Sequence, residues 1–244
     1  MLRPITRQSI AASVFDQLRD HIVQGQLAPG DSLPSERVLA EQLGVNRGAV
    51  REGLKRLEQA GLVSIQQGET TQVRDFRRTA GLELLGTMLL RADGTIDTAV
   101  ARSIVELRSE LAPVIARLAV RRASEQHLDR VDAAVAAMRA TSNLDELQHA
   151  ALHFWTAVVD GTQNVALQLA MGSLSRSYGA VLSQLASVMA AEVRATEDYA
   201  ALASALRGRR EPSAVKRAQK IVALGADAVG GVIDAVSAFQ GEAR

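Results

Sequence analysis

Four basic side chains on one short segment are the residues best placed to do chemistry. Arg47, Arg51 and Lys55 recur at every fourth position, Arg56 follows, and Glu52 is the only acid among them. A spacing of four puts the first three side chains on one face of a helix. Guanidinium and ammonium groups in such an array suit the phosphates and base edges of a nucleic acid. The segment therefore indicates a surface that contacts DNA.

Two capped helices are predicted to position this basic face. Ser35 can cap the first helix, which stops at Gly44, and Asn46 can cap the second, which stops at Gly61. Apolar residues three or four positions apart mark the buried sides: Val38, Leu39 and Leu43 in the first helix, and Val50, Leu54 and Leu57 in the second. Because its apolar and basic residues lie on different faces, the second helix can pack and still offer its cations.

Small residues begin the second helix, and a hairpin follows it. Gly48 and Ala49 allow the helix N-terminus to approach a base edge closely, as in a helix-turn-helix motif. Alternating runs at both ends of 62–74 surround Gln67 and Gly68 and predict a β-hairpin, or wing. The alternative is an ordinary solvated pair of helices with surface arginines. Caps, basic face and hairpin together favour a winged helix-turn-helix.

In these residues the chain resembles the winged-helix domain of the GntR family of bacterial regulators. The resemblance rests on three motifs: Pro34-Ser35-Glu36-Arg37, Val50-Arg51-Glu52 with Leu54 and Leu57, and Gly61-Leu62-Val63 followed by Gly68. It implies a sequence-specific transcription regulator that contacts DNA through Arg37, Asn46, Arg47 and Arg51, with the wing at Gly68 in the minor groove. Glu69 departs from the family pattern, because its charge would face phosphates.

Composition limits the other functions open to the chain. The 244 residues carry a formal net charge of +1, and 47% are hydrophobic but only 3% aromatic, which predicts a core of closely packed helices. Zero cysteines exclude disulfides, a zinc ribbon and thiol catalysis. The sequence also lacks a phosphate-binding loop motif and a strand-glycine-helix unit, so an enzyme is not expected. A protein-interaction module whose basic helix binds an acidic partner is a further alternative.

Neither a secretion signal nor a membrane span is expected, and the predicted location is the cytoplasm. The first thirty residues carry charges throughout and have no apolar core segment. The apolar run 221–239 contains Asp227 and Asp234, each costing about 2.5–3.5 kcal/mol near a bilayer centre. This run is therefore predicted to be a buried amphipathic helix.

The chain is predicted to be mainly α, with a winged helix-turn-helix DNA-binding domain at 1–78 and an all-α effector-binding and dimerisation domain at 79–244. A helix over 10–24 is expected to brace the motif. Beyond residue 78 the apolar spacing is helical, and Pro113 is expected to kink the second helix of the bundle. The expected helices cover 80–91, 97–122, 124–139, 143–160, 164–189, 191–207 and 212–239. Such bundles usually hold ligands between facing helices.

Residues Ile104 to Arg108, with the apolar positions up to Ala119, are similar to the helix that opens the ligand-binding domain in the FadR branch of the family. A homodimer is expected, because one recognition helix buries little surface, whereas two held about 34–36 Å apart read successive major grooves of a pseudo-palindromic operator in double-stranded DNA. The family resemblance favours a repressor that a small-molecule effector releases. A long-chain fatty acyl-CoA is the favoured effector, and a small organic acid is the alternative.

One cation and three aromatic residues are left to form an effector pocket: Arg108, Trp155, Tyr178 and Tyr199. They could offer an apolar wall and a counter-charge to an acyl thioester or a carboxylate. The resemblance adds Gly225 and Asp227, whereas Ala228, Val232 and Ser237 stand where a polar, an aromatic and a basic contact are expected. The alternative is that the aromatic side chains only fill the core.

No metal or other cofactor is predicted. Most members of the branch bind a divalent metal through an aspartate and three histidines, but the corresponding positions here hold Ala151, Trp155, Tyr199, and Ile221 or Val222. A rival row of ligands, Asp145, His149 and His153, recurs at every fourth residue. It falls opposite the apolar face of its helix, so a solvated polar face is favoured. His21 and His127 are isolated and read as surface residues.

Overall fold

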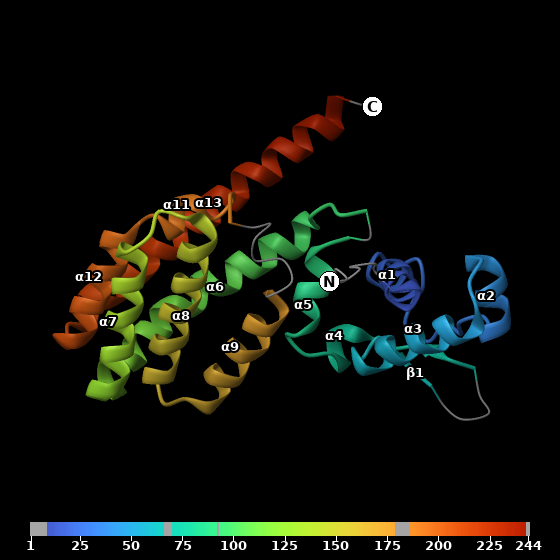
Figure 1. Cartoon of the computed structure of the whole chain (residues 1–244), viewed down its shortest axis with the longest axis horizontal. Coiled ribbons are helices and arrows are strands. Elements are labelled where there is room, and N and C mark those ends of the chain that lie inside the picture. Colours follow the sequence, from blue (N-terminus) through green and yellow to red (C-terminus); the bar gives the residue numbers. More distant parts are fainter. Residues whose placement is uncertain (1–8, 66–69, 92, 179–185, 243–244) are drawn as a thin grey trace, which may run out of the picture. The chain divides into compact units, whose positions relative to one another are not determined.

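The chain folds into two compact units, Met1–Ile96 and Asp97–Arg244. The computed structural model describes residues 9–65, 70–91, 93–178 and 186–242, without the side chains of 176–178 and 236–242 (Figure 1). The sequence predicts that residues 79–96 belong to the second domain, but in the structure they pack with the first unit. Leu84 belongs to the hydrophobic core of that unit, and the Leu90 carbonyl accepts a hydrogen bond from Arg19 Nη2 at 3.2 Å.

The first unit is a small helical domain with a two-stranded sheet. Its elements are α1 (Ile10–Val23), α2 (Glu36–Leu43), α3 (Arg47–Gln59), β1 (Val63–Ser64), β2 (Gln72–Val73), α4 (Phe76–Thr79) and α5 (Leu84–Leu89). The strands are antiparallel, with Val63 opposite Val73, so the predicted hairpin is confirmed at its base. The expected helix over 80–91 is shorter than predicted, because it begins only at Leu84 and Leu90 forms a β-bridge with Ile96.

The core of the first unit forms where α1 crosses α3. Val50 and Leu57 of α3 are completely buried, and Leu18 of α1 is buried in the same cluster. A Cβ on Gly53 would lie 2.7 Å from Val14 Cγ1, so the absence of a side chain at Gly53 lets the two helices approach this closely. The first helix therefore braces α3, as the sequence predicts.

The second unit is an all-α bundle, so the predicted fold class is confirmed. Its described helices are α6 (Thr98–Arg122), α7 (Glu125–Arg139), α8 (Leu144–Gly161), α9 (Val165–Tyr178), α11 (Ala190–Val193), α12 (Thr196–Arg207) and α13 (Glu211–Glu242). The main helix pairs are α6 with α13, α7 with α8, and α12 with both α13 and α7 (Figure 1). Helix α6 contains Pro113 and continues through it.

Two expected helices are interrupted. Residues 186–189 form a turn, so the helix predicted over 164–189 does not reach its expected end. The helix predicted over 191–207 is split into α11 and α12, and Arg194 and Ala195 lie between them. Neither break is marked by glycine or proline, so the apolar spacing alone gives no signal for it.

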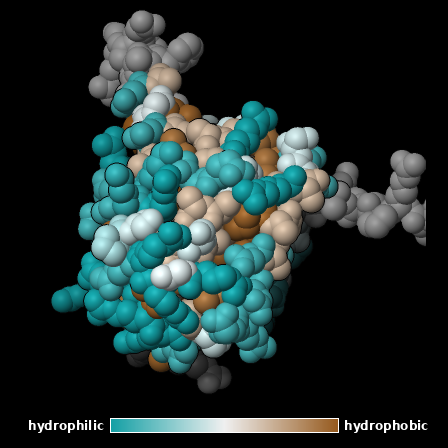
Figure 2. Space-filling view, turned by 90° about the vertical axis from the view of Figure 1, so that its left-hand side faces the viewer, coloured by the Kyte–Doolittle hydropathy of each residue, from teal (hydrophilic) through white to brown (hydrophobic). Residues whose placement is uncertain are grey.

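Helix α13 has the amphipathic character that the sequence predicts for 221–239. Ile221, Val229 and Ile233 are buried, whereas Asp227 and Asp234 are exposed. Among the described residues, no helix is both long enough and apolar enough to cross a membrane. The face of the second unit on the side of α7 and α12 is largely hydrophilic, with apolar residues scattered among the polar ones (Figure 2).

Candidate nucleic-acid interface and effector site

Helix α3 has a basic face exposed to solvent, and its opposite face packs in the hydrophobic core. Val50, Leu54 and Leu57 are buried, whereas Arg47 and Arg51 are exposed. The side chain of Asn46 caps the helix by accepting a hydrogen bond from the Ala49 backbone N–H at 2.8 Å. The preceding helix α2 ends at Gly44, whose φ of 64° is the left-handed conformation that favours glycine. The predicted caps and helix-turn-helix geometry are confirmed.

The cations of this face differ in their partners. Arg51 donates to both oxygens of Glu36, from Nε at 3.1 Å and from Nη2 at 2.9 Å, and so joins α3 to α2. The hydrogen bonds from Arg51 lower the pKa of the Glu36 carboxyl. Lys55 pairs with Glu52 at 3.2 Å within α3. Arg51 is therefore half of an oriented, nearly neutral pair.

Arg47 differs from the candidate DNA-binding residues Arg37 and Arg51, because it has no ion-pair partner among the described residues. In the described part of the chain it forms no hydrogen bond or ion pair, and its side chain is exposed at the first residue of α3. Arg37 is also exposed, but it pairs with Glu41 at 2.7 Å. An unpaired guanidinium beside the free N–H groups of a helix N-terminus is well suited to a phosphate or a base edge.

The remaining DNA candidates fall into three groups. Gly48 is exposed, and a Cβ there would lie 3.2 Å from Asn46 Oδ1, so glycine keeps the cap uncrowded. Ala49 is buried and belongs to the packed side of α3. Gln67 and Gly68 lie outside the described residues. The DNA contacts of all these positions stay predictions.

In the second unit, four predicted effector residues gather around a carboxylate that the sequence analysis missed. Glu192 of α11 is 2% exposed, and its Oε1 accepts hydrogen bonds from Arg108 Nη2 at 2.5 Å and from the Tyr199 hydroxyl at 3.3 Å. The other carboxylate oxygen, Oε2, lies against Gly225, where an added Cβ would be only 2.0 Å from it. Trp155 is buried nearby, on α8. The only sequence signal for Glu192 is a lone acid in the apolar run 186–193.

Aromatic contacts close this cluster on the side of α8. The Phe154 ring makes edge-to-face contacts with Trp155, at 5.8 Å between centroids, and with Tyr199, at 4.9 Å. Burial raises the pKa of the Tyr199 hydroxyl well above its usual range, and the charge of Glu192 acts in the same direction. The hydroxyl therefore stays protonated and serves as a hydrogen-bond donor.

Two other effector candidates are not placed with the cluster. Asp227 is exposed on α13, two residues beyond Gly225. Tyr178 ends α9, but its side chain lies outside the described residues.

The positions that hold the metal ligands in most of the branch are buried here and carry no chelating side chain. Ala151, Trp155, Tyr199 and Ile221 are all buried, and the described residues contain no group of three or more histidine, aspartate or glutamate side chains able to hold a metal ion. The absence of a metal stays a prediction.

The rival row of ligands on α8 is a solvated polar face, as expected. Asp145, His149 and His153 are all exposed, and a ring nitrogen of His149 lies 2.7 Å from the Asp145 carbonyl oxygen. His21 is exposed, and His127 is half-buried because it caps α7 with Ser124.

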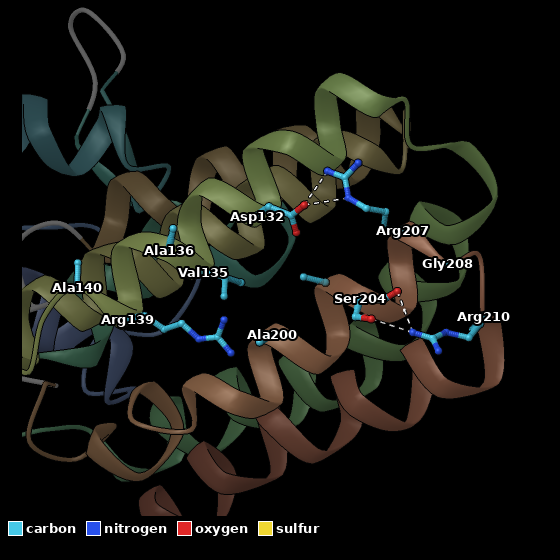
Figure 3. A pocket seen from close by; sticks show the side chains of 11 residues that line it. Asp132, Val135, Ala136, Arg139, Ala140, Ala200, Ser204, Arg207, Gly208 and Arg210 are labelled. Atoms are coloured by element: carbon cyan, nitrogen blue, oxygen red, sulfur yellow. Dashed lines mark hydrogen bonds and ion pairs between the residues drawn. The ribbon is translucent and has the colours of Figure 1, made fainter.

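A groove of about 980 Å³ lies apart from this cluster, between α7 and α12 (Figure 3). Its arginines already have acceptors: Arg207 pairs with Asp132 at 2.6 Å, and Arg210 donates to the Ser204 side chain at 2.9 Å. The groove is therefore lined by small side chains and by arginines that already have hydrogen-bond or ion-pair partners.

Comparison with known proteins assigns both units to families. The family described as "Bacterial regulatory proteins, gntR family" matches residues 10–73, and the FCD domain matches residues 103–223. The HTH-type transcriptional regulator Mce2R of Mycobacterium tuberculosis (strain CDC 1551 / Oshkosh) is 40% identical over 223 residues, which are 91% of this chain and 92% of that one. The fatty acid metabolism regulator protein of Edwardsiella ictaluri (strain 93-146) is 39% identical over 132 residues, or 54% and 53% of the two chains.

Solved structures share the fold at low sequence identity. A structure titled "Lar controls the expression of the Listeria monocytogenes agr system and mediates virulence" matches with a TM-score of 0.60 and 16% identity, and covers 92% of this chain and 98% of that one. A GntR family regulator from Pseudomonas syringae pv. tomato str. DC3000 matches with a TM-score of 0.50 and 19% identity over 95% and 89% of the chains. The chain is thus a transcription regulator of the GntR family, in its FadR branch, with an N-terminal DNA-binding unit and a C-terminal FCD domain for a small-molecule effector.

Proposed function

We propose that this regulator binds a pseudo-palindromic operator as a homodimer, represses transcription, and leaves the DNA when an effector enters the FCD domain. The observation that carries the DNA-binding half is the unpaired, exposed Arg47 at the capped N-terminus of α3. Two such helices held about 34–36 Å apart read successive major grooves, which is why a dimer fits a pseudo-palindrome.

The DNA contacts proposed for each residue follow from its surroundings. Arg47 reads a base edge or binds a phosphate, while Arg51 binds in the orientation that Glu36 gives it. Arg37, whose partner is the exposed Glu41, contacts the DNA backbone. Asn46 and Gly48 shape the helix N-terminus so that it can approach closely.

Replacing Arg47 tests this interface. Arg47→Ala should weaken operator binding by about 1–3 kcal/mol, or roughly 5–150-fold, in a gel shift with the chain's own promoter DNA. Arg102→Ala is the matched control, because Arg102 is an exposed arginine of the second unit and its loss changes the net charge equally. Equal affinities of a folded Arg47→Ala protein and the wild type would contradict the assignment.

A long-chain fatty acyl-CoA is the effector that we favour. Support comes from the relative named fatty acid metabolism regulator and from the buried aromatic residues beside Arg108. Each buried CH₂ of an acyl chain supplies about 0.8 kcal/mol, so a long chain provides much of its own affinity. A small organic acid is the second candidate, because Arg108 already holds a carboxylate.

A thermal-shift screen against acyl-CoAs, free fatty acids and small organic acids tests the effector half. A ligand that binds only the folded protein raises its melting temperature. The effector should also lower operator occupancy. Stabilisation without loss of operator binding would contradict the proposed release.

A further inference from the structure

Glu192 is a buried acidic residue, and the proposed function assigns it no role. One of its oxygens accepts from Arg108 and Tyr199, whereas Oε2 has no hydrogen-bond partner in the described part of the chain. A buried carboxylate oxygen without a donor is costly and rare in folded proteins. The carboxylate is therefore held at Arg108 with only part of its hydrogen-bonding capacity used.

The space around the orphaned oxygen is already filled. A Cβ on Gly225 would lie 2.0 Å from Glu192 Oε2 and 2.7 Å from Met189 Cε, so the carboxylate occupies the room that a side chain at Gly225 would take. Other glycines of α13 differ, because a Cβ on Gly230 or Gly231 would meet nothing within 4 Å. On the side of Gly225, a ligand therefore has no room beside this carboxylate and has to replace it.

The segment that carries Glu192 is suited to such a movement. Helix α11 has only four residues, and no side chain caps its N-terminus at Met189. A turn over 186–189 precedes it, and Arg194 and Ala195 separate it from α12. Displacing α11 therefore breaks few helical hydrogen bonds, and it changes contacts that this segment makes with α13 and α8.

We propose that Glu192 is an internal counter-ion, which holds Arg108 in the effector-free protein and is displaced by a carboxylate ligand. This inference rests on the proposed effector site, and it selects a carboxylate anion, the second effector candidate, over the acyl-CoA, whose neutral thioester cannot replace the Glu192 carboxylate. An incoming carboxylate keeps Arg108 and the Tyr199 hydroxyl hydrogen-bonded, while Glu192 moves to water. A cationic ligand would be repelled by Arg108, and a neutral alcohol has no charge with which to replace the ion pair.

Two variants weaken the internal counter-ion in different ways. Glu192→Gln removes the charge at nearly constant shape, and Gly225→Ala pushes the carboxylate away from α13. Gly231→Ala is the matched control on the same helix. The sole tryptophan, Trp155, reports binding by fluorescence, and calorimetry measures the affinity directly. The probes are acetate, hexanoate and dodecanoate, with dodecanol as the neutral comparison.

We expect both variants to bind at least one carboxylate at least about fivefold more tightly than the wild type and Gly231→Ala do. Dodecanol should bind all four proteins alike. Equal carboxylate affinities in the variants and the wild type, no carboxylate binding to any of the proteins, or a gain for dodecanol equal to that for dodecanoate would overturn the proposal. If Glu192→Gln does not fold, the affinities of Gly225→Ala test the proposal. If Gly225→Ala does not fold, those of Glu192→Gln test it.

A gel shift separates this inference from the proposed function. If wild-type protein binds its promoter DNA but the carboxylates show no preference for the variants, only the counter-ion proposal fails. If the wild type does not bind promoter DNA, the proposed function fails, whatever the ligand measurements show.

Discussion

Replacing Glu36 by glutamine should strengthen DNA binding, although the residue belongs to the DNA-facing motif. Its carboxylate neutralises Arg51 from distances of 2.9 and 3.1 Å. Glutamine keeps an acceptor for Arg51 and so preserves its orientation, but it removes the negative charge. A phosphate bound to the outer side of Arg51 would lie roughly 7 Å from that charge, where the repulsion in water is about 0.6 kcal/mol. The expected gain in affinity is therefore about threefold.

Fluorescence anisotropy with an operator duplex and a scrambled duplex measures this effect. Both affinities should rise about threefold at low salt, and the gain should vanish near 1 M salt, where charges are screened beyond about 3 Å. Glu110→Gln in the second unit is the control, because it makes the same change in net charge far along the chain. Because Arg51 lowers the pKa of Glu36, the carboxylate is charged between about pH 6 and 8, and pH changes in this range should not mimic the variant.

A different result would refute the reasoning. If Glu36→Gln lost operator affinity while its affinity for scrambled DNA stayed the same, Glu36 would contribute to base recognition directly. Unchanged affinity at low salt would mean that no phosphate lies near the Arg51–Glu36 pair.

Three further predictions concern stability and cofactors. Asn46→Ala removes the cap hydrogen bond to Ala49 and should lower the free energy of unfolding by about 0.5–2 kcal/mol in urea titrations; no change would contradict the capping role. Gly53→Ala brings a Cβ to 2.7 Å from Val14 Cγ1, so it should destabilise the first unit by about 1–3 kcal/mol, and Val14→Ala in the same chain should relieve part of the loss. Elemental analysis of the purified protein should find no stoichiometric zinc, nickel or manganese, and a chelator should leave its melting temperature unchanged; one tightly held metal per chain would refute this.

The local features of the first unit were predictable because their causes lie within a few residues of one another. The cap at Asn46 bonds to a backbone three positions away, and the stop at Gly44 depends on its own φ. The separation of Val50 from Arg47 on α3 follows from the period of a helix. Such signals survive in any tertiary setting, so the winged helix-turn-helix could be read from spacing alone.

The partners of the charged residues were not predictable in the same way. Arg51 meets Glu36 across 15 positions, and only the angle between α2 and α3 brings them together. Ala49 was also not predictable in this respect. As a small residue at a helix N-terminus it was expected to allow access to DNA, but it lies on the buried side of α3. A sequence pattern gives the face of a helix but not what covers that face.

The candidate effector site combines both situations. Arg108 could be singled out because its helix resembles the one that opens the ligand-binding domain in the FadR branch. Its partner Glu192 lies 84 positions away, on a helix that apolar spacing does not separate from α12. Gly225 came from family resemblance without a physical reason, and the structure supplies one, because any side chain there would collide with the Glu192 carboxylate. A glycine inside a long helix costs about 1 kcal/mol relative to alanine. At position 225 this cost has a structural counterpart, because a Cβ there would force the buried Glu192 carboxylate to move, whereas a Cβ at Gly230 or Gly231 would meet nothing within 4 Å.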